Sequence, residues 1–141
     1  SQGKHISEDY ARKICEIVEN NSSYVQQLAW NVLAETDIEA TEQNFQNGVE
    51  ALMAQCTGLF EQQLQGLTTY QLNFIRAICQ GVHSDFGSKA ILEEYNLGSK
   101  SNVSRIKTAL RERELIEITQ NKVYLEDPVF RLWFQQKVDN Y

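Results

Sequence analysis

One stretch of the sequence concentrates side chains that can recognise nucleic acid. It combines hydroxyl, amide and cationic groups without an acidic residue, and its candidate contact residues are Ser99, Lys100, Ser101, Asn102, Ser104, Arg105, Lys107 and Thr108. Arginine, lysine and asparagine contact base edges and phosphates in the major groove, and short polar side chains let the backbone approach the DNA. Lys122, further along the chain, adds a positive charge suited to a phosphate contact. Together these residues form a candidate DNA-binding site.

An ordinary solvated helix face and a protein-contact surface are the other interpretations of this stretch. The residues that follow it carry mixed charge, as expected of a helix face in water: Arg111, Glu112, Arg113 and Glu114. The pI of the chain is about 4.9, far below the basic value typical of a dedicated DNA-binding domain. The sequence therefore leaves DNA, a protein partner and an intramolecular contact open.

Other residues with reactive side chains show no catalytic or metal-binding spacing. The cysteines lie far apart, and we expect buried, reduced thiols at all three positions: Cys15, Cys56 and Cys79. His5 and His83 are isolated in sequence, so neither a zinc site nor a catalytic triad is supported. Trp30 and Trp133 are expected to be core or interface anchors, because tryptophan buries a large area where it packs.

Charge is distributed unevenly along the chain. Residues 1–66 carry three Lys or Arg against ten Asp or Glu, a net charge of −7. Residues 67–141 carry ten against nine, a net charge of +1, which completes the −6 of the whole chain. The first half should therefore repel phosphate, whereas the second can carry a local basic face.

Apolar residues recur with helical spacing in three segments of the first half. The first helix begins after Ser7, a suitable N-cap followed by two acidic residues. The polar turn 20–23 separates it from a second helix over residues 24–33. The third starts near Thr41 and continues until Gly66 ends it. We therefore expect a three-helix bundle over residues 1–66.

Shorter helices are expected in the second half. Thr68 and Gln71 form a capping-box pattern at the start of the first of them, which Gly81 ends. A short helix follows from Ser88, and the turn 96–101 leads into a third helix that carries the candidate contact residues. This pair of helices joined by a tight turn is typical of a helix-turn-helix.

A hairpin follows the third of these helices. Alternating residues predict strands over 116–119 and 122–125, and Asp127-Pro128 starts a final helix. The order helix, short helix, turn, helix and hairpin is typical of a winged helix, whose third helix enters the major groove in DNA-binding members. The predicted fold is mainly α: a three-helix bundle, then a winged helix-turn-helix domain with a small β-hairpin over residues 67–141.

The second half also resembles a known family. Residues 95–105 and 124–134, with Leu115-Ile116 between them, are similar to the winged helix of prokaryotic AAA+/STAND-like ATPases, a signal-transduction family abundant in archaea and Bacteroidetes. That family typically shows D-P-x-F-R-x-W after the wing. The matching residues here are Asp127, Pro128, Phe130, Arg131 and Trp133.

The first half resembles the helical lid of the same ATPases. Residues 20–26 lie where the family often has G-x-P-Y-Y-x-Q near the nucleotide, although Asn20 and Ser22 stand where the family has Gly and Pro. The resemblance implies that four residues lie near the nucleotide in the intact protein: Ser23, Tyr24, Gln26 and Gln27. The alternative is that Tyr24 packs between helices and that the glutamines face solvent.

The resemblance implies a longer parent protein with its own ATPase domain upstream. The chain opens with Ser1-Gln2-Gly3 rather than Met, which indicates a cloning remnant or an internal cut, so we expect a fragment. It contains no G-x-x-x-x-G-K-[ST] phosphate loop. We therefore expect no enzyme activity and no cofactor in this chain, and ATP with Mg²⁺ in the parent.

The function expected from the resemblance is regulatory. The lid would couple the nucleotide state of the upstream ATPase domain to the winged helix, which would contact DNA or a protein partner. The alternative is a stand-alone transcription regulator whose helical half dimerises. No apolar run is long enough for a membrane span and no export signal is visible, so we expect a cytoplasmic protein without a membrane partner.

Overall fold

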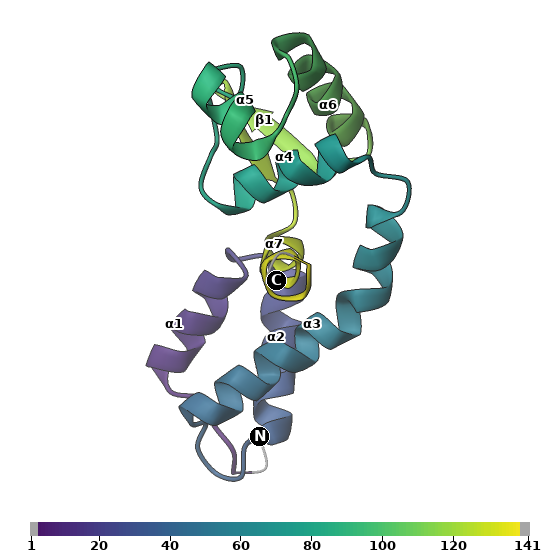
Figure 1. Ribbon diagram of the computed structural model, residues 1–141. Coiled ribbons are helices and arrows are strands. Elements are labelled where there is room, and N and C mark those ends of the chain that lie inside the picture. Colours follow the sequence, from purple (N-terminus) through teal and green to yellow (C-terminus); the bar gives the residue numbers. More distant parts are fainter. Residues whose placement is uncertain (1–2, 139–141) are drawn as a thin grey trace. The chain divides into compact units, whose positions relative to one another are not determined.

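The computed structural model describes residues 3–138 and divides into two compact units, Ser1–Gln63 and Leu64–Tyr141 (Figure 1). Helices dominate both units, and the described part of the second also holds a two-stranded antiparallel sheet. The predicted fold class is therefore confirmed. The division falls just before Leu64, whereas the sequence analysis placed the boundary after Gly66.

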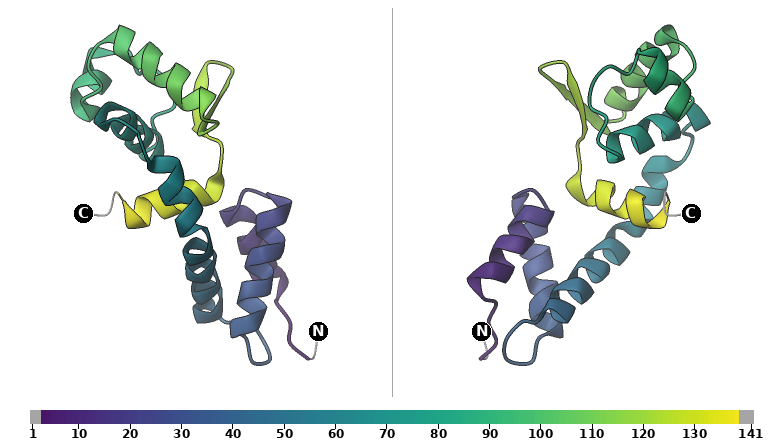
Figure 2. Two further views of the ribbon diagram at one scale, coloured as in Figure 1. Left: turned by 90° about the vertical axis from the view of Figure 1, so that its right-hand side faces the viewer. Right: turned by 60° about the vertical axis from the view of Figure 1, so that its left-hand side comes forward.

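Three helices form the first unit, drawn from purple to blue-teal in Figure 2: α1 (Glu8–Ile17), α2 (Ser22–Glu35) and α3 (Glu42–Leu64). Ser7 caps α1, as predicted, because its hydroxyl accepts a hydrogen bond from the first turn. Asn21 caps α2, since its Oδ1 accepts from the amide of Tyr24 at 3.1 Å. Ser22 and Ser23, expected in the preceding turn, therefore belong to the first turn of α2.

The core of this unit contains apolar residues from all three helices: Ile14, Val18, Leu28, Val32, Phe45, Val49, Leu52 and Met53. Gly48 lets α3 approach α2 closely. A Cβ at Gly48 would lie 2.5 Å from Cγ2 of Val32 and 3.1 Å from the backbone nitrogen of Val32. No side chain fits this contact without displacing the valine or its backbone.

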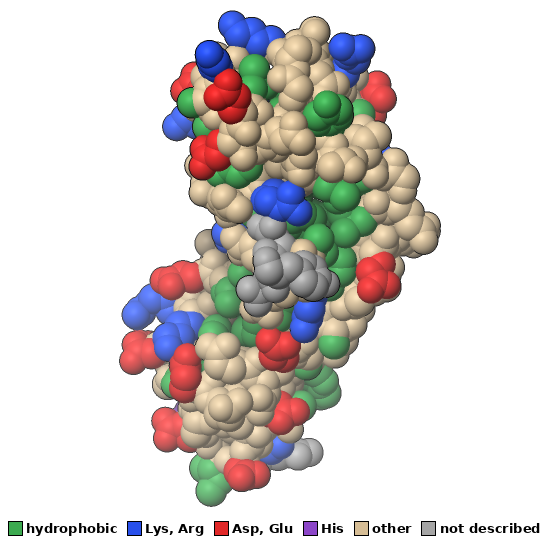
Figure 3. All heavy atoms as spheres, viewed as in Figure 1, with side chains coloured by type: hydrophobic (Ala, Val, Ile, Leu, Met, Phe, Trp, Pro, Cys, Tyr) green, Lys and Arg blue, Asp and Glu red, His purple; other side chains and the backbone are tan. Residues whose placement is uncertain are grey.

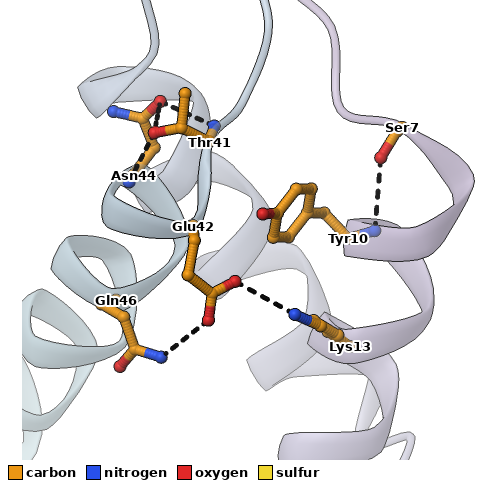
Figure 4. Close-up of polar contacts among 7 residues, drawn as sticks. All are labelled: Ser7, Tyr10, Lys13, Thr41, Glu42, Asn44 and Gln46. Atoms are coloured by element: carbon orange, nitrogen blue, oxygen red, sulfur yellow. Dashed lines mark hydrogen bonds and ion pairs between the residues drawn. The ribbon is translucent and has the colours of Figure 1, made fainter.

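A polar contact joins α1 to the start of α3. Charged side chains of both signs intermingle over α1 in Figure 3. Lys13 Nζ donates to Glu42 Oε2 at 3.0 Å, and Gln46 Nε2 donates to Oε1 of the same carboxylate at 3.2 Å (Figure 4). The hydrogen bond from Lys13, followed by that from Gln46, lowers the pKa of Glu42. Lys13 also lies 4.9 Å from the ring centroid of Tyr10.

The second unit, drawn from teal to yellow, contains four helices and a hairpin within its described residues: α4 (Thr69–Cys79), α5 (Lys89–Tyr95), α6 (Lys100–Glu112), β1 (Ile116–Thr119), β2 (Lys122–Leu125) and α7 (Pro128–Lys137). The predicted capping box is present, with Thr68 and Gln71 exchanging hydrogen bonds at the start of α4. Asp127 caps α7 and Pro128 occupies its first turn, also as predicted.

The hairpin has a two-residue turn. Gln120 and Asn121 both adopt positive φ, at 52° and 65°, which matches the twist of the flanking strands in a turn of this length. The register pairs Ile116 with Leu125 and Thr119 with Lys122. Side chains on one face of the hairpin are consequently buried and those on the other are exposed.

The core of the second unit is dominated by aromatic and branched side chains: Phe74, Ile75, Ile78, Phe86, Leu97, Val103, Ile106, Leu110, Val123, Phe130, Trp133 and Phe134. Phe74 and Phe86 stack with ring centroids 4.3 Å apart. Trp133 is 2 % exposed and packs near Phe130, as the sequence analysis expected of an anchor. Trp30 differs, because 70 % of it is exposed and it takes no part in the core.

The burial of the cysteines and the character of the helices can be compared with the sequence expectations. Cys79 is buried, as predicted, but Cys15 and Cys56 are only half-buried, and Cys56 lines a pocket between α2 and α3. Within residues 3–138, no helix combines the length and the apolar character needed to cross a membrane.

Substituting the two glycines of α3 should change stability in opposite directions. We expect Gly48→Ala to lower the free energy of unfolding by about 1–3 kcal/mol, because the added methyl overpacks the contact with Val32. Gly58→Ala is the control, since its Cβ would meet no atom within 4 Å. It should raise the free energy of unfolding by about 0.5–1 kcal/mol through helix propensity. Urea unfolding followed by circular dichroism measures both, and a stabilising Gly48→Ala would contradict the packing described.

Lys13→Gln should raise the pKa of Glu42 toward its ordinary value of 4.5. In the unaltered chain the lowered pKa contributes stability that is present above the unfolded pKa and is lost as the pH falls through the folded pKa. The variant should therefore show a flatter loss of stability in acid. Carboxyl ¹³C shifts recorded against pH give the pKa, with Arg12→Gln as the control on the same helix. An unchanged Glu42 pKa in Lys13→Gln would refute the assigned cause.

Candidate functional site

Helix α6 is held as the second helix of a helix-turn-helix by amides around the preceding turn. Asn73 Nδ2, from α4, donates to the carbonyl of Asn96 at 3.2 Å, and Asn102 Nδ2 donates to the carbonyl of Leu97 at 2.7 Å. Arg76 Nη1 in turn donates to Asn73 Oδ1 at 2.9 Å. The fully buried Leu97 lies between the two amide contacts. These bonds define where α6 begins and which face it turns outward.

The turn itself requires backbone conformations with positive φ. Asn96 adopts φ 53° at the C-cap of α5, and Gly98 adopts φ 84°. A Cβ at Gly98 would also lie 3.0 Å from Nδ2 of Asn102. Glycine is therefore suited to this position by both its conformation and its size.

The outward face of α6 is polar, small and exposed. Its exposed residues are Lys100, Ser101, Ser104, Arg105, Thr108, Arg111 and Glu112. The hydroxyl groups of Ser104 and Thr108 donate back to carbonyls of their own helix, so they lie close to its surface. A shallow groove of about 300 Å³ follows this face and is lined by Ser104, Arg105, Thr108, Ala109 and Glu112.

Three of the predicted contact residues also have structural roles. Ser99 Oγ accepts a hydrogen bond from the amide of Asn102, so Ser99 is the N-cap of α6. The side-chain nitrogen Nδ2 of Asn102 donates a hydrogen bond to the carbonyl of Leu97, as described above. Lys107 is half-buried, and its Nζ lies 5.6 Å from the ring centroid of Phe86. These three residues thus make contacts within the fold, although Ser99 stays exposed.

Three exposed cations of the predicted set remain, namely Lys100, Arg105 and Lys122. Arg111 joins them on the same face of α6, and the sequence analysis had counted it only among residues of mixed charge. Arg111 follows Ser104 by seven residues, about two helical turns, so the spacing in the sequence could have placed it on this face. In the view of Figure 3, Lys and Arg side chains lie around the outer end of this unit.

A histidine from the loop after α4 contacts the second strand of the wing. His83 accepts a hydrogen bond at its carbonyl from Val123 N at 2.8 Å, and its ring Nδ1 lies 2.9 Å from the Val123 carbonyl. Because a carbonyl only accepts, Nδ1 carries the proton. The ring also packs on Tyr124, with centroids 4.7 Å apart. The backbone of His83 thus adds one hydrogen bond to β2.

A pocket lies between α2 and α3 in the first unit. Its volume is about 420 Å³, and it is lined by Ser23, Tyr24, Gln27, Leu52, Gln55 and Cys56. It brings together three of the four residues that the resemblance placed near a nucleotide. Gln26, the fourth, is exposed and is not among the lining residues.

The polar wall of this pocket is an amide network. Gln27 Nε2 donates to Gln55 Oε1 at 3.1 Å and to Asn31 Oδ1 at 3.3 Å, and Asn31 Nδ2 donates to Gln55 Oε1 at 3.1 Å. The glutamine Gln27 is therefore ordered against α3 rather than simply solvated. None of the lining residues is charged, so the pocket offers no cation to a phosphate. Among the described residues, no three His, Cys, Asp or Glu side chains are grouped to hold a metal ion.

Comparison with known proteins agrees with this geometry. The family described as "Probable winged helix domain" matches residues 58–136. A solved structure of a Walker-type ATPase from Pyrococcus abyssi is similar at a TM-score of 0.73 with 14 % identity. The similarity covers 93 % of this chain and 37 % of that one, so this chain spans little more than a third of the ATPase.

No curated protein matches the sequence significantly. The identity to the ATPase is low, and the likeness shows a shared fold. The family match, in contrast, covers more than half of the chain, including all of α4, α5, α6 and the hairpin. The chain therefore belongs to the probable winged helix domain family.

Proposed function

We propose that this chain is the C-terminal lid and winged-helix region of an AAA+-type ATPase, and that its winged helix binds duplex DNA. The observation that carries the proposal is the outward face of α6, small, polar and cationic, in a chain whose fold matches 93 % of its length to part of a Walker-type ATPase. The catalytic domain, with ATP and Mg²⁺, is upstream in this proposal, and this chain by itself is not an enzyme.

The face of α6 suits the major groove for two physical reasons. Ser101, Ser104 and Thr108 are short, so the helix axis can approach the base edges closely. Lys100 and Arg105 project from the first half of the helix, where helix-turn-helix domains make base contacts. Glu112 lies at the other end, and its charge repels phosphate there. The proposed contact is therefore centred on the first two turns of α6, with Lys122 of the wing beside it.

The pocket between α2 and α3 supports a second part of the proposal, contact with the nucleotide of the upstream domain. Its residues do not fit the triphosphate, because no Lys or Arg lines it. They do fit an uncharged part of a nucleotide, since Tyr24 offers an aromatic face and Gln27 and Gln55 offer amide groups. In the proposal, the lid senses the nucleotide through this pocket, and the winged helix responds by a shift between two arrangements.

Arg105→Glu should weaken DNA binding by this chain at least about tenfold, because it replaces an exposed cation on the contact face by an anion. Fluorescence anisotropy with a labelled duplex at low and moderate salt measures the affinity and its salt dependence. Arg12→Glu is the charge-matched control on α1, and it should bind within about twofold of the unaltered chain. Equal losses in both variants would indicate general electrostatics, and no binding at low salt would move the proposal to a protein partner.

Tyr24→Ala should raise the Kd of the full-length protein for an ATP analogue about tenfold, as expected for loss of a base-stacking aromatic. Gln26→Ala is the control, because Gln26 lies on the same helix outside the pocket. Titration with a fluorescent, non-hydrolysable analogue gives both constants. If the two variants bind equally well, the pocket does not contact the nucleotide.

A further inference from the structure

The groove on α6 presents methyl groups beside a guanidinium group. Thr108 is exposed, and its Oγ1 donates to the carbonyl of Ser104 at 3.1 Å, about one helical turn earlier. The hydroxyl proton is therefore used within the helix, so the side chain offers a ligand its methyl group and no hydrogen-bond donor. The half-buried Ala109 adds a second methyl group, and both residues line the shallow groove of about 300 Å³.

Arg105 lines the same groove three residues before Thr108, so the two side chains share one face of α6. Arg105 is exposed and forms no ion pair within residues 3–138. Its guanidinium is thus available as a planar fork of N–H donors. The base edge that matches such a fork in the major groove is guanine, because its N7 and O6 are neighbouring acceptors.

The methyl groups have their own counterpart in the major groove. Thymine is the one base of the four that carries a methyl group there, and threonine methyl groups and alanine side chains make apolar contacts with it. Three residues advance a helix by about 4.5 Å, close to the rise of about 3.4 Å between base pairs. Side chains at this spacing contact successive base pairs when a helix lies in the groove. Arg105 and Thr108 are therefore spaced for adjoining base pairs.

We propose that α6 reads a guanine with Arg105 and the methyl group of a thymine in the adjoining base pair with Thr108 and Ala109. This rests on the proposed function, which names duplex DNA but no sequence. The specificity comes from the shape and donor pattern of one groove on the helix. It does not depend on the net charge of the chain, which is −6.

A selection experiment followed by atomic replacements in the DNA tests this readout. The 141-residue chain is used to select bound duplexes from a pool with a randomised centre, and sequencing should show enrichment of a G·C pair directly beside an A·T pair. Fluorescence anisotropy then gives the Kd for the selected duplex. Replacing its guanine by 7-deazaguanine removes the N7 acceptor and should raise the Kd about tenfold. Replacing its thymine by deoxyuridine removes the methyl group alone and should raise the Kd about threefold.

Protein variants assign each replacement to its side chain. Thr108→Ser removes the methyl group and keeps the hydroxyl, so deoxyuridine should then cause almost no further loss, since both changes remove the same contact. Arg105→Gln should in the same way abolish the effect of 7-deazaguanine. Thr57→Ser is the matched control, because Thr57 on α3 also donates its hydroxyl proton to the carbonyl four residues earlier, that of Met53. This variant should keep the full effect of deoxyuridine.

The outcomes separate this proposal from the proposed function. Binding without enrichment of any sequence would overturn the readout and leave a contact directed at phosphates. Enrichment of a site without the adjoining guanine and thymine would also overturn the readout alone, and so would additive losses from Thr108→Ser and deoxyuridine. If the chain binds no duplex of the pool at low salt, DNA binding by α6 is refuted, and the readout with it.

Discussion

The orientation of α6 depends on a few side-chain amides that satisfy backbone carbonyls at the turn before it. A turn between two short helices leaves carbonyl groups without helical partners, and buried carbonyls of this kind are costly unless another donor reaches them. Asn73 and Asn102 supply those donors, and Arg76 holds Asn73 in place. Because Leu97 is fully buried between them, the turn cannot rotate without exposing it. The outward face of α6 follows from this constraint.

The same constraint gives several of the predicted contact residues a second role. Ser99 and Asn102 help to shape the turn and Lys107 packs against Phe86, so these predicted contact residues also have a role within the fold. The exposed cations of α6 are Lys100, Arg105 and Arg111, and short hydroxyl residues lie among them. A helix with so few exposed cations gains specificity from close approach rather than from a large positive field, which is consistent with a chain whose net charge is −6.

Charge also separates the tasks of the two units. The first carries most of the negative charge, but no charged residue lines the pocket between α2 and α3. The uncharged pocket between α2 and α3 is thereby suited to an uncharged part of a ligand. The second unit is nearly neutral and exposes its cations on α6 and at the wing. In the proposed parent protein, one unit would therefore meet the nucleotide-binding domain and the other would meet DNA.

Local signals in the sequence determined the elements of this protein. Caps such as Ser7, Thr68 and Asp127, the hairpin turn at Gln120-Asn121 and the apolar periodicities act within a few residues of each other, so the chain alone specifies where its helices and strands begin. The winged-helix order could be predicted for the same reason.

Only the tertiary structure decided which residues of each helix face a neighbour. Asn102 and Arg105 were equal candidates in the sequence, yet one bonds the preceding turn and the other faces outward. Likewise, Trp30 and Trp133 were both expected to be anchors, yet one is exposed and the other is buried. The pocket between α2 and α3 joins Gln27 to Gln55, which are far apart in the chain. Such contacts depend on how distant segments pack, and that information is not local to any stretch of the sequence.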